Sequence, residues 1–365
     1  MEDLVRTTPR DSRRPAPDLW RNRRVLVTGH TGFKGSWLCL LLSGLGANVS
    51  GFALPQEPGP TAFDLLGVAD HLQQSQLGDL RDTSAVAAAV REANPEIVLH
   101  LAAQAVVGRG YRDPAGTFAT NVTGTINLLE ALRAQMDSLA AAVIVTSDKV
   151  YRNDGTGQAF RETDPLGGGD PYSASKAACE IAVASYAHSF AGALPPLATA
   201  RAGNVIGGGD FGEDRLIPDL FRAERAGQPL LIRRPDATRP FQHVLDVLCG
   251  YLLLAEDLTL RSPETPRAVN FGPEDREMSV RDVLGTLGRV RGRPVEWRQA
   301  DPQAVYAEAP RLAIDASLAR QSLRWEPRLK GDAIFTETAA WYEAWLKGET
   351  LRGLSERAIE RAITP

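Results

Sequence analysis

The chain has 365 residues, of which 43% are hydrophobic and 24% charged, values typical of a globular protein with a sizeable core. Its net charge of -4 and the lack of long apolar runs give no reason to expect nucleic-acid or membrane partners. Cys39, Cys179 and Cys249 lie in apolar helical patterns and the first residues do not resemble a signal peptide, so we predict buried thiols in a cytoplasmic protein.

The amino-terminal part contains a pattern typical of dinucleotide binding. Residues 1–19 are rich in Arg, Pro and Thr without periodicity, and we predict a disordered leader. A short apolar strand at 24–28 then enters a glycine-rich loop, and an apolar helical pattern follows at 36–42. Glycines allow the backbone to approach a pyrophosphate, and the helix N-terminus offers free amides to it. The predicted cofactor-binding residues of this loop are Gly29, Thr31, Gly32, Phe33, Lys34 and Gly35.

The next strands supply the rest of the predicted cofactor site. A strand at 47–52 ends without the acidic residue that often binds the adenosine ribose, and no basic residue replaces it. The sequence therefore leaves NAD and NADP open, with NAD preferred. Asp79 and Leu80 follow a third strand and are expected to meet the adenine. A fourth strand at 97–101 leads into small residues that let a cofactor lie close, and we assign Leu101, Ala102, Ala103 and Gln104 to the cofactor site.

Chemistry is expected at the end of the strand that begins at Val143. A long amphipathic helix at 113–135 precedes this strand, which delivers Ser147, Asp148 and Lys149 to its carboxyl end. These residues are common at strand ends for purely structural reasons. However, the chain contains only five lysines among its 41 basic residues, so a retained lysine is more often needed for its titratable ammonium. We therefore expect an acid–base pair at Asp148 and Lys149.

A second reactive pair is predicted on a helix that begins near Pro171. Tyr172 and Lys176 are four residues apart and lie on one helix face. The alternative is an exposed pair with a small effect on helix stability. The dinucleotide loop upstream favours catalysis, because the lysine and a cationic nicotinamide ring would help the tyrosine lose its proton.

Strands and helices alternate up to a sixth strand at 197–201, which predicts a doubly wound parallel sheet of the Rossmann type with a smaller C-terminal substrate-binding domain. We assign residues 20–200 and about 241–270 to the first domain, and about 201–240 and 271–350 to the second. Arg215, Arg233 and Arg239 lie in loops suited to bind a diphosphate, with Arg239 favoured. His100 and His243 are interpreted as structural, and no metal is expected.

Together these motifs resemble the extended short-chain dehydrogenase/reductase superfamily, through the glycine loop, Asp79-Leu80, residues 101–104 and the Tyr172–Lys176 pair. Within it, residues 29–38, 147–151, 201–210 and 237–245 resemble the CDP-glucose 4,6-dehydratase family. The resemblance extends from about residue 20 to residue 342. An Asp-Lys pair at positions 148 and 149 marks this family, because the dTDP-glucose dehydratases carry Asp-Glu there.

The resemblance implies a redox-neutral dehydration of a nucleotide sugar with tightly held NAD. Tyr172 would take the proton of the 4-hydroxyl, assisted by Ser147, while Lys176 would bind the nicotinamide ribose. Asp148 would protonate the departing 6-hydroxyl, and Lys149 would remove the proton on carbon 5. Asn204 and Arg239 would hold the diphosphate. Helices at 113–135 and 172–190 would pair into a homodimer or a dimer of dimers.

The chain departs from this family at several positions around the expected site. Gly108 stands where an arginine is usual, Val150 where a cysteine is usual, and Gly169 where a larger residue is common. Phe211 and Phe241 replace tryptophans. The alternatives are therefore a dehydratase or epimerase that acts on another nucleotide sugar, and an NAD-binding regulatory protein without catalysis.

Overall fold

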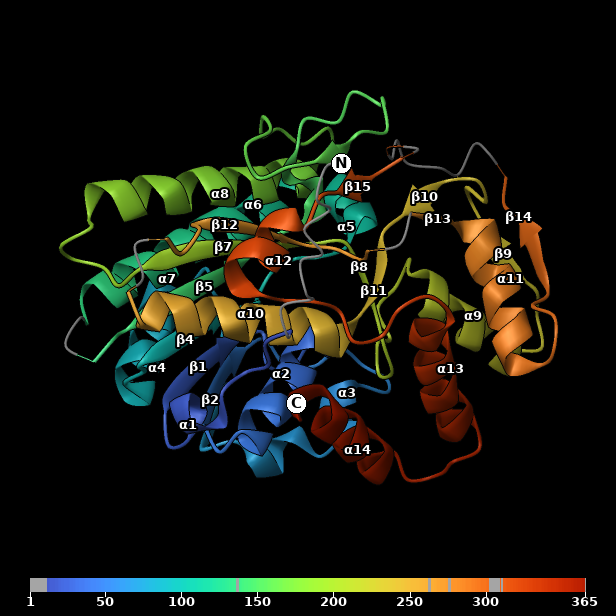
Figure 1. The fold of residues 1–365 in the computed structure, drawn as a ribbon, viewed down its shortest axis with the longest axis horizontal. Helices are drawn as coiled ribbons and strands as arrows, with labels where there is room; N and C mark the ends of the chain where they lie inside the picture. The colour runs from blue at the N-terminus through green and yellow to red at the C-terminus, as the bar shows by residue number, and fades with distance from the viewer. Residues whose placement is uncertain are drawn as a thin grey trace, which may run out of the picture.

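The computed structural model describes residues 12–135, 138–261, 264–274, 277–301, 309 and 311–364. Within these ranges, the centre of the molecule is a seven-stranded sheet in which all neighbouring strands are parallel (Figure 1). Its strands, in spatial order, are β12 (Ala268–Phe271), β7 (Leu197–Ala202), β5 (Ala141–Val145), β4 (Ile97–His100), β1 (Arg24–Thr28), β2 (Asn48–Ala53) and β3 (Gln74–Leu77). This confirms the predicted doubly wound sheet.

The strand order reverses between β1 and β4. The chain runs outward from β1 to β3, and then returns to place β4, β5, β7 and β12 on the other side. In sheets of this kind ligands bind at the carboxyl ends of the strands beside such a reversal. The glycine loop follows β1, and residues 101–104 follow β4, so both predicted cofactor segments lie at this position.

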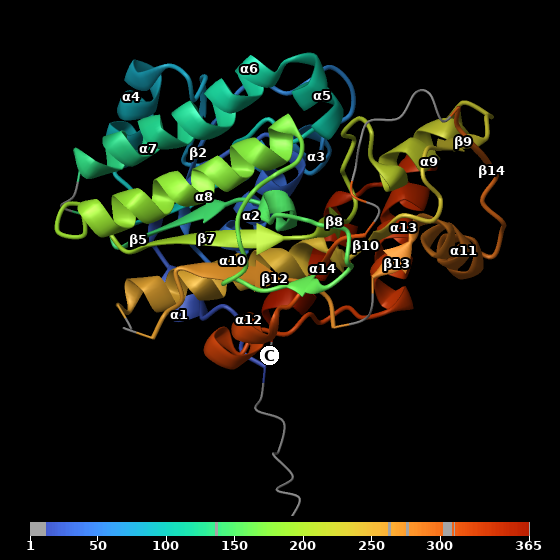
Figure 2. The same cartoon turned by 90° about the horizontal axis from the view of Figure 1, so that it is seen from above.

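The central strands are buried on both faces, which explains why β1, β4 and β5 are mainly apolar, whereas the edge strand β3 is polar and largely exposed. Val25 and Val27 of β1 belong to one hydrophobic core, and Leu26 between them belongs to the other. Helices cover each face, as the view from above shows (Figure 2). On one face lie α4 (Thr83–Ala93), α5 (Val107–Arg112), α6 (Pro114–Phe118), α7 (Gly124–Arg133) and α8 (Pro171–Ser189). On the other lie α1 (Pro17–Trp20), α2 (Phe33–Gly44), α10 (Val244–Thr259), α12 (Ser317–Leu323) and α14 (Arg352–Ile363).

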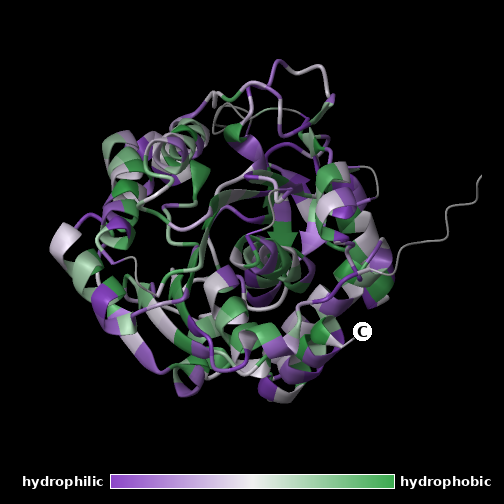
Figure 3. Cartoon of the chain, turned by 60° about the vertical axis from the view of Figure 1, so that its left-hand side comes forward, coloured by the Kyte–Doolittle hydropathy of each residue, from purple (hydrophilic) through white to green (hydrophobic). Residues whose placement is uncertain are grey.

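A second lobe stands beside the carboxyl ends of the strands (Figure 2). It contains α9 (Leu216–Arg225), β9 (Leu230–Ile232), β10 (Thr238–Arg239), β13 (Met278–Ser279), α11 (Val280–Arg291), β14 (Trp297–Gln299) and α13 (Asp332–Leu346). The remaining elements are α3 (Ala62–Leu65), η1 (Val68–His71), η3 (Asp148–Val150), β6 (Ala159–Phe160), β8 (Asn204–Ile206), β11 (Phe241–His243) and β15 (Ala313–Ile314). Several helices are coloured green and purple on the same element (Figure 3), as expected when one helix face packs inward.

The prediction of a disordered leader at residues 1–19 is wrong from residue 12 onward, where the chain is packed against the molecule. Residues 1–11 lie outside the described residues. Trp20 is completely buried, and its indole nitrogen donates to Glu256 Oε1 at 2.8 Å. The same carboxylate binds Arg13 NH2 at 2.6 Å and the backbone amide of Ala16 at 2.7 Å. A buried acid on α10 therefore ties this segment to the molecule, a contact that local composition does not indicate.

The helix predicted at 113–135 is interrupted by a π-helical turn, η2 (Ala119–Thr123), between α6 and α7, and α7 ends at Arg133. Asn121 in this turn is buried and bonds the main chain of Gln104 through both its side-chain atoms. Cys39, Cys179 and Cys249 are free and buried, as predicted. In the part of the chain that is described, no helix is long and apolar enough to cross a membrane.

Buried His243 should contribute a loss of stability at mildly acidic pH. Burial lowers the pKa of His243 from 6.5 to about 4. Between these values the unfolded chain binds a proton at His243 that the folded chain excludes, so the contribution of this residue to the free energy of unfolding falls as pH falls, by about 1 kcal/mol per pH unit. His243→Asn keeps an acceptor for the amide of Leu245. In urea unfolding between pH ~4 and ~6.5, we expect the variant to take up about one proton fewer on unfolding than the wild type, so that its free energy of unfolding depends less on pH. The matched change at exposed His188 should leave the dependence unchanged.

Candidate functional site

A cleft of about 330 Å³ lies at the carboxyl ends of β5 and β7, against the second lobe. It brings together residues that are far apart in the sequence. The predicted site residues that line it are Phe33, Lys34, Ser147, Asp148, Lys149, Tyr172, Asn204, Arg215, Arg233 and Arg239. All the predicted catalytic and substrate-binding residues except Lys176 thus line one cavity.

The turn after β5 presents a hydroxyl, a carboxyl and an ammonium in succession. Ser147 Oγ donates to Asp148 Oδ1 at 3.0 Å, and it accepts from the amide of Lys149 at 3.2 Å. Lys149 Nζ lies 3.6 Å from the same carboxylate oxygen. Asp148 is 1% exposed, and its Oδ2 has no hydrogen-bond partner among the described residues. A buried carboxyl with an unused oxygen in a cleft is suited to exchange a proton with a ligand.

The first turn of α8 places Tyr172 opposite this turn. Asp170 caps the helix by accepting from the amide of Ser173 at 3.0 Å, and Pro171 occupies the first helical position. Tyr172 is 8% exposed and lines the cleft. One turn later, Lys176 is buried and donates to the carbonyl of Val145, the last residue of β5, at 3.0 Å. This bond attaches the predicted Tyr172–Lys176 face to the strand that carries Ser147 and Asp148.

Lys34 is a third lysine of this region. It belongs to the first turn of α2, lines the cleft, and places its Nζ 5.8 Å from the ring centre of Tyr251. Burial, followed by repulsion from Lys176 and Arg215, lowers its pKa to about 7. The charge of this part of the cavity therefore changes near neutral pH.

The glycine loop is packed so closely that larger residues cannot replace two of its glycines. Gly29 has a φ of +78°, and a Cβ there would lie 2.7 Å from the backbone nitrogen of Ala102. A Cβ on Gly35 would lie 2.0 Å from the carbonyl oxygen of Gly29. The loop after β1 thus touches the small residues after β4, and the start of α2 lies directly against the loop. Such a cradle fits a pyrophosphate bound to backbone amides.

His30 fills the end of β2 where an acidic residue is often found. Its ring lies against Gly51, where a Cβ would come within 2.3 Å of the imidazole. Its Nε2 is 2.8 Å from Ser75 Oγ on β3. Gly51 must therefore remain small to accommodate His30.

The other predicted cofactor residues border the same region without lining the cleft. Asp79 is engaged by the side chain of Arg81, with Nε at 3.0 Å. Leu80 is buried and its carbonyl accepts from Asn127 at 2.8 Å. Gln104 donates to Thr117 Oγ1 at 2.9 Å. Thr31 Oγ1 donates to the carbonyl of Leu54 at 2.9 Å. Gly32, Leu101 and Ala103 lie in these same loops.

The predicted diphosphate-binding arginines lie on the second-lobe side of the cleft. Arg215 NH1 is paired with Asp210 at 2.7 Å, and Arg233 NH1 lies 3.4 Å from Asp214. Arg239 is 7% exposed and donates to the carbonyl of Thr238 at 2.8 Å. A nearly buried guanidinium that faces a cleft is the most suitable of the three to bind an anionic ligand.

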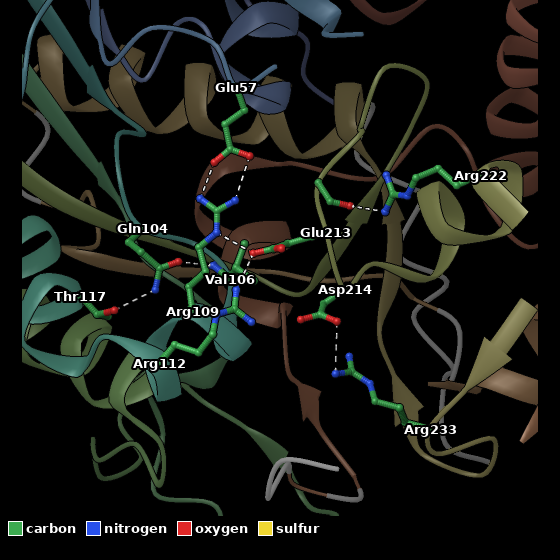
Figure 4. A network of polar contacts seen from close by, with 11 residues as sticks. Glu57, Gln104, Val106, Arg109, Arg112, Thr117, Glu213, Asp214, Arg222 and Arg233 are labelled. Atoms are coloured by element: carbon green, nitrogen blue, oxygen red, sulfur yellow. Dashed lines mark hydrogen bonds and ion pairs between the residues drawn. The ribbon is translucent and has the colours of Figure 1, made fainter. Parts of the chain in front are cut away.

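Sequence reasoning missed a network of charged residues at the edge of the cleft (Figure 4). Arg109 of α5 binds Glu57 Oε2 at 2.8 Å and Glu213 Oε1 at 2.6 Å. Arg112 binds the same oxygen of Glu213 at 2.9 Å. Glu57 follows β2, Arg109 follows β4 and Glu213 follows β8, so the network links segments around the cofactor loop to the wall of the cleft. Nothing in the local sequence indicates these partners.

Sequence reasoning also missed a buried ion pair behind the site. Glu180 of α8 and Arg201 of β7 are 4% and 3% exposed, and Arg201 NH2 lies 2.8 Å from Glu180 Oε2. The spacing of Tyr172, Lys176 and Glu180 at four-residue intervals was the available signal, because it places the acid on the same helix face as the tyrosine and the lysine. Within the described ranges, no group of three or more His, Cys, Asp or Glu side chains could hold a metal ion.

The chain is similar to several known proteins. A curated relative, CDP-glucose 4,6-dehydratase of Salmonella typhimurium, is 39% identical over 349 residues, which cover 94% of this chain and 96% of the relative. The dTDP-glucose 4,6-dehydratase of Xanthomonas campestris pv. campestris is 30% identical, covering 88% of this chain and 95% of that one.

Among solved structures, dTDP-glucose 4,6-dehydratase of Bacillus anthracis in complex with NAD has a TM-score of 0.73 at 22% identity, over 90% of this chain and 99% of the other. UDP-glucose 4-epimerase of Thermus thermophilus in complex with NAD has a TM-score of 0.74 at 25% identity, over 87% and 98%. The sequence profile of the family described as GDP-mannose 4,6 dehydratase matches residues 26–338. The chain therefore belongs to the GDP-mannose 4,6-dehydratase family of extended short-chain dehydrogenases/reductases.

Proposed function

We propose that the chain is an NAD-dependent hydro-lyase that converts CDP-glucose to CDP-4-keto-6-deoxyglucose. The observation that carries this proposal is the Asp148–Lys149 pair, 3.6 Å apart in the cleft and beside Ser147 and Tyr172. An epimerase needs only to remove and return a hydride, whereas a dehydratase also needs an acid and a base for the elimination. The similarity to the Salmonella enzyme supports CDP-glucose as the substrate.

The residues present fit a dinucleotide. Close contact of Gly29 with Ala102 and of Gly35 with Gly29 forms the cradle that a pyrophosphate requires. Gly29, Thr31, Gly32, Phe33, Lys34 and Gly35 would hold the pyrophosphate, and Lys176 the nicotinamide ribose. Asp79, Leu80 and residues 101–104 would border the adenosine. When bound, NAD would accept the hydride of carbon 4 and return it to carbon 6.

Three side chains serve the oxidation at carbon 4. Tyr172 takes the proton of the 4-hydroxyl, and Ser147 shares a hydrogen bond with the same oxygen. Lys176, one helical turn from Tyr172, supplies the positive charge that makes this proton transfer favourable. Its bond to the carbonyl of Val145 keeps that charge next to the strand that carries Ser147.

Two side chains serve the elimination of water. A ketone at carbon 4 makes the proton on carbon 5 acidic, so Lys149 is a sufficient base. Lys149 returns this proton to carbon 5 when carbon 6 receives the hydride, which completes reduction of the double bond between the two carbons. Asp148 gives its proton to the departing 6-hydroxyl through Oδ2, the oxygen that no described residue engages. One turnover needs both an acid and a base. The main chemical feature of the site is therefore that Asp148 and Lys149 are neighbours in one turn.

The nucleotide diphosphate would lie across the second-lobe side of the cleft. Asn204 and Arg239 would bind it, with Arg215 and Arg233 as further positive charges. Gly108 and Val150 are buried near the cleft, where the resemblance leads one to expect an arginine and a cysteine. A related nucleotide sugar is therefore the alternative substrate.

The direct experiment is incubation of the protein with NAD and CDP-glucose, beside dTDP-glucose, UDP-glucose and GDP-mannose. We expect a 4-keto product from CDP-glucose, detected by its alkaline absorbance and by a mass lower by one water. Turnover of another nucleotide sugar with CDP-glucose unchanged would contradict only the substrate. If NAD binds and none of these sugars is converted, the proposed catalysis is wrong.

Lys149→Met should reduce turnover about a hundredfold or more, because it removes the base for carbon 5. NAD affinity should be unchanged, since Lys149 lies on the substrate side of the site. Turnover and calorimetric NAD binding measure the two effects. Lys347→Met, on a lysine whose side chain is 65% exposed, is the control. Near-normal turnover of Lys149→Met would contradict the assigned role.

Gly29→Ala should weaken NAD binding by more than about tenfold, because the new methyl group combines an unfavourable positive φ with a clash against Ala102. Gly192→Ala is the matched control, since nothing lies within 4 Å of a Cβ there. Titration calorimetry with NAD compares the two variants. An unchanged dissociation constant for Gly29→Ala would show that the loop is not the cofactor cradle.

We also propose that the protein is a cytoplasmic homodimer. Its free, buried cysteines suit a reducing compartment. Large apolar side chains are exposed on both of the helical segments predicted to pair, at Phe118 (38%) on α6 and Ile181 (61%) on α8, and α6 and α8 contact each other. Pairing of the segments 113–135 and 172–190 with the same two segments of a second copy in a four-helix bundle would cover these side chains, and a dimer of dimers is the larger alternative.

Ile181→Arg should shift the protein toward the monomer, because the charge would be desolvated at the centre of this interface. Light scattering after size-exclusion chromatography measures the mass. Leu231→Arg, at another exposed leucine on β9 (55%), should leave the mass unchanged. A monomeric wild-type protein would contradict the proposed dimer.

A further inference from the structure

The carboxylate of Glu180 is completely enclosed by hydrogen-bond donors. Arg201 Nε binds its Oε1 at 2.9 Å and Arg201 NH2 binds its Oε2 at 2.8 Å. The hydroxyl of Thr199 donates to Oε2 at 2.6 Å, and the hydroxyl of Thr146 donates to Oε1. Glu180 lies away from the cleft lining, so it does not contact the substrate. Its bonds connect α8 to the ends of β5 and β7.

Arg201 extends this network to the far side of the catalytic turn. Its NH1 donates to the hydroxyl of Tyr151 at 2.8 Å, and its guanidinium lies 5.0 Å from the centre of the Tyr151 ring. Tyr151 in turn donates to Asn270 Oδ1 of β12 at 2.6 Å. Tyr151 is 2% exposed and does not line the cleft, so it also has no contact with the substrate.

The two connections fall at the two ends of one segment. Thr146 immediately precedes Ser147, and Tyr151 follows Val150 at the end of η3. Ser147, Asp148 and Lys149 lie between them. On the same helix, Tyr172 lies two turns before Glu180 and Lys176 lies one turn before it. We propose that the Glu180–Arg201 pair, with Tyr151, is a positioning unit that sets the distance between the two groups of catalytic residues. This inference depends on the proposed function of those residues.

The bonding pattern favours a positioning role for the ion pair over a general contribution to stability. A buried ion pair stabilises weakly in net, since desolvation offsets much of its attraction, but a bidentate Arg–carboxylate pair defines a geometry through its two parallel bonds. Here the carboxylate is bidentate and two hydroxyls complete its bonding. A displacement of the turn by about 1 Å is enough to cost a large factor in rate.

Tyr151→Phe tests the unit, with Thr199→Val as the matched control. Each removes one buried hydroxyl that bonds to the ion pair, but only Tyr151 is attached to the catalytic turn. We expect both variants to melt at similarly reduced temperatures. Turnover of Tyr151→Phe should fall roughly tenfold with KM changed by less than about twofold, while Thr199→Val keeps kcat within about twofold of the wild type. Equal losses of kcat in the two variants would show a merely structural role and overturn the proposal.

Amide hydrogen exchange supplies a second readout that needs no turnover. Peptides that cover residues 146–152 should exchange faster in Tyr151→Phe than in the wild type or in Thr199→Val, whereas α8 should stay protected in all three proteins. Unchanged exchange of the turn would overturn the positioning role even if the enzyme is active. If the wild type converts no nucleotide sugar, the proposed function fails, and the exchange comparison still decides whether Tyr151 holds the turn.

Discussion

The proposed catalytic centre depends on how one helix is attached to the ends of two strands. Lys176 binds the last carbonyl of β5, and Glu180, one turn further along α8, binds Arg201 of β7. Both contacts are buried, where an unpaired charge would be strongly unfavourable, so α8 cannot slide or rotate without losing them. The bonds of Lys176 and Glu180 therefore fix the position of Tyr172 relative to Ser147 and Asp148, which line the same cleft.

A different constraint shapes the cofactor side. On that side, backbone segments are in direct contact, so only glycine or residues with small side chains fit. Gly29 lies against Ala102, and Gly51 leaves room for the ring of His30. This close packing brings the loops after β1 and β4 together at the reversal of the strand order, where a dinucleotide binds in sheets of this type. Buried polar bonds thus hold the proposed catalytic side of the site, whereas close contacts of glycines shape the proposed cofactor side.

The edge of the cleft is held by charges that remain accessible to water. Arg109 joins Glu57 and Glu213 in one network (Figure 4), with side chains that are 39%, 64% and 43% exposed. Exposed ion pairs contribute little individually, and more when they form a network. Because Glu213 also lines the cleft, this network and Gly108 both shape the cleft wall.

The sequence by itself determined the order of strands and helices, the parallel sheet, and the residues with reactive groups, because apolar periodicity, glycine spacing and the Tyr172–Lys176 interval are local signals. The tertiary structure decided what those groups touch. It packed residues 12–20 against Glu256 and placed Arg201 between Glu180 and Tyr151. It also introduced a π-helical turn at Asn121 into the predicted helix. These contacts join residues distant along the chain, and a buried donor can be satisfied by any acceptor that the fold brings near. Local sequence therefore indicates that a partner is needed, and only the folded chain selects it.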